Sequence, residues 1–135
     1  LSVALVEVGS GGSLAAGLNS VERARSVLIG AYAAPTEERM AGLLRVSPRK
    51  WARASSSIDR AKELAAAAGL LTSSHWVVCV GGAQRDPGGS SYVQVVYRLP
   101  GNRWETQRVA LRGLADQAYL TLTTQILDQM RRLLK

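Results

Sequence analysis

The sequence has little of what disulfides, metal sites and membrane spans require. It contains one cysteine, Cys79, and one histidine, His75, so it can form no internal disulfide and offers no Cys/His cluster for zinc. No apolar run reaches the roughly 18 residues that a membrane-spanning helix needs. We therefore expect a cytoplasmic protein that makes no membrane contact and carries no metal or other cofactor. The valines around Cys79 indicate a buried structural thiol rather than a nucleophile.

The composition is that of a globular protein with an excess of basic residues. With 135 residues, 47% of them hydrophobic, the chain suits one domain spanning 1–135. A formal charge of +7 favours an acidic partner such as nucleic acid, but the basic residues are scattered. The densest basic group is Arg45, Arg49, Lys50 and Arg53, with Trp51 among them. We expect a solvated surface there and keep a phosphate-contacting patch as the alternative.

Apolar runs and turn signals alternate along the chain in a strand–helix pattern. The predicted strands are Leu1–Val8, Ser26–Ala33, Trp76–Val80, Tyr92–Leu99 and Trp104–Leu111, the last two forming a hairpin around Pro100-Gly101-Asn102. The predicted helices are one starting near Ser13, Thr36–Leu44, Pro48–Ala52, Ser57–Ala68 ended by Gly69, and Leu114–Leu134. The stretch Gln84–Ser91 is predicted as a loop. This alternation predicts an α/β fold, a three-layer α/β/α sandwich with helices on both faces of a mixed sheet.

Two of these elements carry finer predictions. The apolar run Ser26–Ala33 predicts a strand that is buried. The final helix is amphipathic, and two copies can associate through its apolar side, so we expect a homo-oligomer. That side is predicted to consist of Leu120, Ile126, Leu127, Met130, Leu133 and Leu134.

The segment Val6–Gly12 is the most informative stretch of the chain. It is a glycine-rich turn at the end of a predicted strand, and a predicted helix follows it. Glycine permits backbone angles that other residues avoid, and exposed N–H groups at a helix N-terminus favour anions. The plain alternative is an ordinary strand-to-helix turn. We take Glu7, Ser10, Gly11 and Gly12 as candidate contacts to a nucleotide or another anionic small molecule.

Other candidate residues lie after the third predicted strand. Ligands on α/β sheets bind at the carboxyl ends of strands, which adds Gly81 and Gly82 to the candidates. Arg85 is a candidate phosphate contact, with a solvated loop tip as the alternative. A divalent cation would require the fold to bring Glu7 and Asp86 together. His75 is expected to be a partly exposed histidine at a strand edge.

The order of these segments resembles the C-terminal domain of the CinA (competence/damage-inducible protein A) family, the nicotinamide mononucleotide deamidase domain. That family carries A-E-S-C-T-G-G, Y-S-N-E-A-K, G-A-V-S-E and G-I-A-G-P-x-G-G motifs, a hairpin, and G-D-R before the last helix. The corresponding segments here are Val6–Gly12, Pro35–Met40, Arg53–Ser57, Gly81–Gly89, the hairpin Tyr92–Leu111, and Leu111–Leu114. The resemblance covers nearly the whole chain and implies the same fold, but the family's first helix is missing. Because the chain starts at Leu1 rather than Met, we expect its natural N-terminus to lie upstream.

The departures from the family pattern fall on the residues that carry its chemistry. The resemblance places the nucleophilic serine of the family at Val8, its lysine base at Met40 and its tyrosine at Pro35. Valine has no hydroxyl and methionine accepts no proton, so no catalytic residue is assigned in this chain. The arginine of G-D-R falls near Leu114, two residues from Arg112.

Three functional hypotheses follow from these observations. The first is a non-catalytic CinA-like domain with a binding or scaffolding role. The second is an active nicotinamide-nucleotide amidohydrolase with a rearranged site that uses Ser10 or Ser13. The third is a basic nucleic-acid-binding module, which would bind DNA in a salt-sensitive way.

Overall fold

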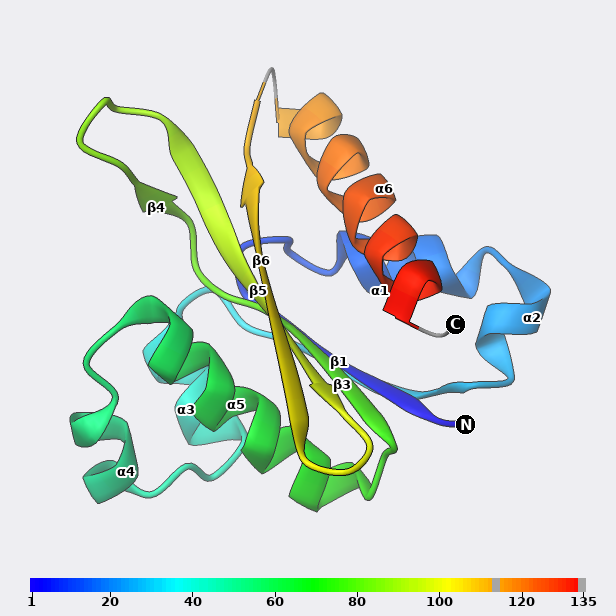
Figure 1. Ribbon diagram of the computed structural model, residues 1–135, viewed down its shortest axis with the longest axis horizontal. Helices are drawn as coiled ribbons and strands as arrows, with labels where there is room; N and C mark the ends of the chain where they lie inside the picture. Colours follow the sequence, from blue (N-terminus) through cyan, green and yellow to red (C-terminus); the bar gives the residue numbers. More distant parts are fainter. Residues whose placement is uncertain (113–114, 134–135) are drawn as a thin grey trace.

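The computed structural model describes residues 1–112 and 115–133. Within that part, strands and helices alternate in the predicted manner (Figure 1). The strands are β1 (Val3–Glu7), β2 (Leu28–Ala33), β3 (Trp76–Val80), β4 (Gln84–Arg85), β5 (Ser91–Leu99) and β6 (Arg103–Ala110). The helices are α1 (Ser13–Asn19), α2 (Glu22–Arg25), α3 (Glu37–Leu43), α4 (Pro48–Arg53), α5 (Ser57–Thr72) and α6 (Ala115–Leu133).

The strands form one mixed sheet, as the sequence predicts. Their order is β2-β1-β3-β5-β4, and β6 pairs with β5 as well. β1 runs parallel to β2 and β3, whereas β5 runs antiparallel to β3, β4 and β6. The β5–β6 hairpin turns at Gly101 and Asn102, both with positive φ, in agreement with the predicted turn.

Side chains on the two faces of the sheet pack into two separate hydrophobic cores. On one face, Leu5 and its neighbours pack with α1 and α6, around the buried Leu14 and Ile126. On the other face, Val6 packs with α3 and α5, around the buried Met40 and Leu64. Figure 1 shows the two groups of helices on opposite sides of the sheet. This is the predicted α/β fold with a mixed sheet between layers of helices.

Helix caps agree with the prediction at some ends and differ at others. The hydroxyl of Thr36 accepts a hydrogen bond from the Arg39 amide, as predicted for the start of α3. At α5 the N-cap is Ser56 rather than Ser57. The predicted stop at Gly69 is wrong, because α5 continues to Thr72. Gly69 has a packing role instead: the Arg98 guanidinium crosses the helix where a Cβ atom would stand.

Three further expectations are corrected by the structure. β2 is an edge strand whose residues alternate between half-buried and exposed, so it is not a buried strand. Part of the predicted loop is strand, since Gln84 and Arg85 pair with Tyr92 and Ser91. The third correction concerns α6, where Leu120 is 69% exposed although it was placed on the apolar side.

The buried line of α6 follows a spacing of four residues. Ala118, Leu122, Ile126 and Met130 face the sheet, so this line belongs to the core rather than to a free surface. The two ends of the predicted helix, Leu114 and Leu134, lie outside the described residues. Among the helices of the described part, none is both long and apolar enough to cross a membrane.

Candidate functional site

The turn after β1 lies against the segment that follows β3. The amide of Val8 donates to the Val80 carbonyl at 3.0 Å, and the amide of Gly9 donates to the Gly81 carbonyl at 3.0 Å. These bonds continue the β1–β3 ladder beyond the strands and bring two glycine-containing segments together. A Cβ atom on Gly9 would stand 2.5 Å from the Gly81 carbonyl oxygen and 2.7 Å from Val93. Only glycine therefore fits at this position.

Glu7 is fully buried at the end of β1 and holds the start of α1. One carboxylate oxygen accepts from the Leu14 amide at 2.8 Å and from the Ser10 hydroxyl at 2.7 Å. The other accepts from the Ala15 amide at 3.0 Å. The Ser13 amide donates to the carbonyl of Ser10. The anion at this helix N-terminus is therefore the side chain of Glu7 itself.

The two serines considered as replacement nucleophiles are held in different ways. Ser10 is 1% exposed, and its hydroxyl is bonded to Glu7. Ser13 is half-buried and accepts a 3.4 Å hydrogen bond from the Thr123 hydroxyl of α6. Gly11 and Gly12 have positive φ angles of 60° and 91°, and no heavy atom lies within 4 Å of a Cβ built on either. The glycines thus form the open part of the turn, and Ser10 the closed part.

The positions where the resemblance places the family's chemistry are apolar and mostly closed. Val8 is 8% exposed and Met40 is fully buried, and both belong to one apolar cluster with Val6 and Leu44. Pro35, by contrast, is exposed just before α3. The structure therefore brings Val8 and Met40 into a shared core, where neither presents a polar group.

A partly buried ion pair lies beside this cluster, and the sequence analysis missed it. One oxygen of Glu37 pairs with the Arg60 guanidinium of α5 at 2.7 Å. The other accepts from the Gly82 amide at 2.9 Å. Glu37 thus ties α3 to α5 and to the segment after β3. In the sequence it looks like an ordinary acidic residue in a first helical turn, and its two partners lie 23 and 45 residues downstream.

Cys79 is buried in the same core. Burial raises the pKa of its thiol far above the ordinary value, and the nearby charge of Glu37 raises this pKa further. A thiol with so little thiolate character is a poor nucleophile and metal ligand. The predicted burial of Cys79 is confirmed.

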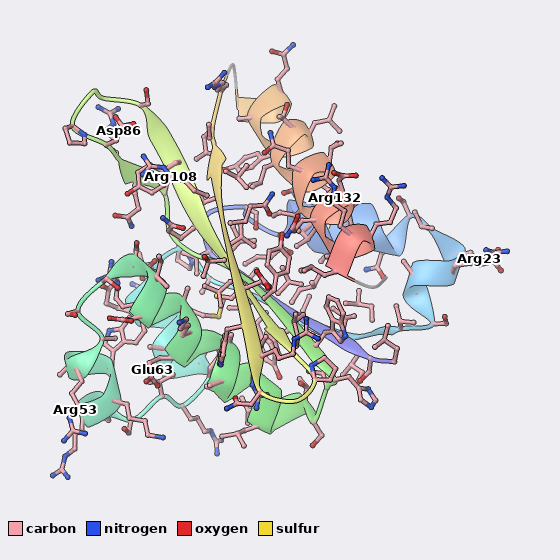
Figure 2. All side chains as sticks on the ribbon, viewed as in Figure 1. Arg23, Arg53, Glu63, Asp86, Arg108 and Arg132 are labelled. Carbon is pink, nitrogen blue, oxygen red and sulfur yellow. The ribbon has the colours of Figure 1, made fainter. Side chains whose placement is uncertain are left out.

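A polar hollow lies elsewhere, where the β4–β5 hairpin meets β6. Its volume is about 480 Å³, and Asp86, Tyr92, Arg108 and Arg112 are among the residues that line it. The guanidinium of Arg108 is 3.5 Å from the centre of the Tyr92 ring and 3.4 Å from the Asp86 carboxylate. Figure 2 shows Asp86 and Arg108 side by side near the hairpin tip. We call this hollow the hairpin cavity.

The remaining candidates lie apart from one another. Arg85 is exposed on β4, next to the hairpin cavity but outside its lining. His75 is exposed before β3, where its Nδ1 atom is 2.9 Å from the Ser2 hydroxyl. Glu7 is committed to α1, whereas Asp86 binds the Ser90 amide and Arg108. Across the described residues, no group of three or more acidic, His or Cys side chains is arranged to hold a metal ion.

Comparison with solved structures gives a consistent result. The fold is similar to a competence-damaged protein (CinA) superfamily protein from Enterobacter cloacae, with a TM-score of 0.82, 20% identity, and coverage of 100% of this chain and 83% of that one. A competence or damage-inducible protein from Enterobacter asburiae gives a TM-score of 0.81, 18% identity, and coverage of 100% and 88%. The competence/damage-inducible protein CihA from Agrobacterium tumefaciens gives a TM-score of 0.79 and 19% identity, with coverage of 100% of this chain and 86% of that one.

The likeness to these proteins is one of fold. No protein-family model matches the chain, and no curated protein sequence matches it. At identities of 18 to 20%, side-chain chemistry need not be shared even where the backbone is. The chain therefore has the fold of the solved CinA superfamily proteins.

Proposed function

We propose that this chain is a non-catalytic relative of the nicotinamide mononucleotide deamidase domain, with a binding or scaffolding role. The observation that carries the proposal is the packing of Val8 and Met40 in one apolar cluster. Covalent amide hydrolysis needs a nucleophile, an adjacent base and access for the substrate. At the two positions that match the family's serine and lysine, this chain supplies no hydroxyl, no proton acceptor and almost no exposed surface.

The geometry of Ser10 argues against a rearranged nucleophile. Its hydroxyl proton points to Glu7, a carboxylate that could act as a base in principle. Both oxygens of that carboxylate, however, already accept amide hydrogen bonds from α1. With 1% of its surface exposed, Ser10 also gives a substrate no line of approach. The amidohydrolase thus remains the second candidate, behind the non-catalytic domain.

Purified protein is expected to release no ammonia from nicotinamide mononucleotide above the rate of buffer alone. The measurement is a coupled ammonia assay, with an active deamidase run in parallel to show that the assay works. Turnover that disappears in Ser10→Ala but persists in Ser20→Ala would overturn the proposal and establish the rearranged amidohydrolase. Ser20 is a suitable control because it is exposed and its hydroxyl bonds only the local Gly17 carbonyl.

We further propose that an anionic small molecule, such as a nucleotide, binds in the hairpin cavity rather than at the start of α1. The first-turn amides of α1 are occupied by Glu7 and Ser10, which leaves them no capacity for a phosphate. The hairpin cavity offers two arginines and a size within the usual range for small-molecule sites. The Arg108 guanidinium lies over the Tyr92 ring and is paired with Asp86, so two contacts fix its position before an anion binds.

Replacing Arg108 with alanine is expected to weaken pyrophosphate binding about tenfold or more, as measured by isothermal titration calorimetry. The reason is that a charge-assisted hydrogen bond contributes about 1.5–3 kcal/mol. Arg103→Ala is the matched control, because Arg103 is an exposed arginine at the other end of the same strand and lies outside the cavity. Equal weakening by both variants would show that pyrophosphate responds to net charge alone and would contradict the site.

A further inference from the structure

A second cavity lies between the α3–α4 connection and α5, and the proposed function does not use it. Its volume is about 170 Å³, enough for one apolar side chain. Its apolar walls come from Val46 on one side and from Ala66, Ala67 and Leu70 of α5 on the other. Leu70 is 79% exposed, so this wall faces solvent. We call this feature the α4 cavity.

Two cationic side chains line the α4 cavity. Arg45 and Lys50 line it, and Arg49 and Arg53 stand nearby in sequence; all four are exposed. Figure 2 shows Arg53 projecting outward from α4, with Glu63 further in along α5. Among the side chains that the structure describes, no carboxylate lies within ion-pairing distance of any of these four cations. Glu63 also lines the cavity, so the lining carries two positive charges and one negative charge.

Arg45 holds a backbone conformation that glycine would adopt more easily. Its φ is 60°, in the left-handed region, immediately after the C-cap of α3. The amide of Val46 reaches back to the Ala41 carbonyl at 2.9 Å, which completes a typical glycine-type helix stop. In the left-handed conformation arginine lowers the stability of the fold modestly relative to glycine. The arginine side chain is therefore kept here at some cost in folding free energy. That side chain lines the α4 cavity.

We propose that the α4 cavity binds an acidic peptide segment of a partner protein, with one apolar side chain of the peptide in the cavity and carboxylates on the surrounding cations. The basic residues Arg45 and Lys50 favour an acidic partner. The apolar walls favour an apolar side chain over a phosphate backbone. Nucleic acid fits less well because Trp51, the aromatic residue of this group, is half-buried and packs against the core. Its ring is therefore only partly available for stacking with an unpaired base.

The test compares short synthetic peptides by NMR titration of the whole chain. The peptide Glu-Glu-Leu-Glu-Glu is expected to shift the amide signals of Val46 and Ala67 and to bind about tenfold more tightly than Glu-Glu-Ser-Glu-Glu. Its affinity should fall as salt is raised. Lys-Lys-Leu-Lys-Lys should not bind. Equal affinity for the leucine and serine peptides, or tighter binding of an oligothymidylate of equal charge, would overturn the proposal.

A pair of glycine variants separates binding from stability. Arg45→Gly should raise Tm by about 2 to 3 °C, because it relieves the left-handed residue, yet weaken the leucine peptide about threefold. Ser73→Gly is the matched control, since Ser73 follows α5 with a φ of 52° and lies outside the cavity. It should raise Tm in the same way and leave peptide affinity unchanged. Unchanged affinity in Arg45→Gly would remove Arg45 from the site and overturn the proposal.

Discussion

Replacement of Glu7 with alanine is expected to lower the free energy of unfolding by about 4 kcal/mol. The carboxylate is fully buried and accepts three hydrogen bonds, two from amides of α1 and one from Ser10. Without it, these donors lose their partners in the protein interior, where an unpaired group costs about 1–3 kcal/mol. Because a domain is stable by only about 5–15 kcal/mol in total, the variant should unfold early in a urea titration.

Three further variants test the explanation for this loss. Glu7→Gln keeps the shape of the side chain but removes the charge and one acceptor oxygen. We expect it to lower the free energy of unfolding about half as much as Glu7→Ala does. Ser10→Ala removes a single bond to Glu7 and should cost about 1 kcal/mol. Glu38→Ala is the control, because Glu38 is an exposed acid in the first turn of α3 and should matter by less than about 0.5 kcal/mol. A Glu7→Ala loss as small as that of Glu38→Ala would show that α1 does not depend on this carboxylate.

The fold could be predicted because its signals are local. Thr36 before two glutamates marks a helix start, and Pro100-Gly101-Asn102 between two predicted strands marks a hairpin. The order of strands and helices then restricts the architecture to a layered α/β fold. The resemblance to CinA domains pointed to the same architecture from different features, the spacing of glycine-rich motifs.

The errors arose where burial depends on distant parts of the chain. The run Ser26–Ala33 is mostly apolar, and only the strand order makes β2 an edge strand with exposed residues. Leu120 is more hydrophobic than Ala118, yet Ala118 lies on the buried line because the sheet fixes the rotation of α6. Hydrophobicity alone does not determine which side of such a helix faces the core.

The candidate site shows the same division between local and distant information. The glycine turn and its closeness to Gly81 follow from the motif order, since the ends of neighbouring parallel strands meet. The role of Glu7 did not follow, because nothing in Val6–Gly12 shows that its carboxylate turns inward to the helix. The Glu37–Arg60 pair did not follow either, since it joins α3 to α5 across the core. Both carboxylates bind neighbouring segments of the fold, at a site where the sequence suggested contacts to a ligand.

Gly9→Ala should destabilise the protein by about 3 kcal/mol, the upper part of the usual range for overpacking. The added methyl would stand 2.5 Å from the Gly81 carbonyl oxygen, which is backbone held in the sheet, and 2.7 Å from Val93. Gly81 cannot move at low cost, because it is bonded to Gly9 on one side and, through its own amide, to the Gln94 carbonyl on the other. Val93 is fully buried in the core, which leaves its side chain little room to shift. The variant should therefore push β1 and β3 apart at the very turn that resembles the family's catalytic loop.

Gly42→Ala provides the matched control for this prediction. Gly42 lies in α3, has no heavy atom within 4 Å of a built Cβ, and has an ordinary helical φ. Alanine there should stabilise the protein by about 0.5–1 kcal/mol through helix propensity. In urea unfolding, Gly9→Ala is expected to lower the free energy of unfolding and Gly42→Ala to raise it. Stabilisation by both would mean that the two turns are not pressed together, and the closed environment of Val8 and Met40 would then lose its structural basis.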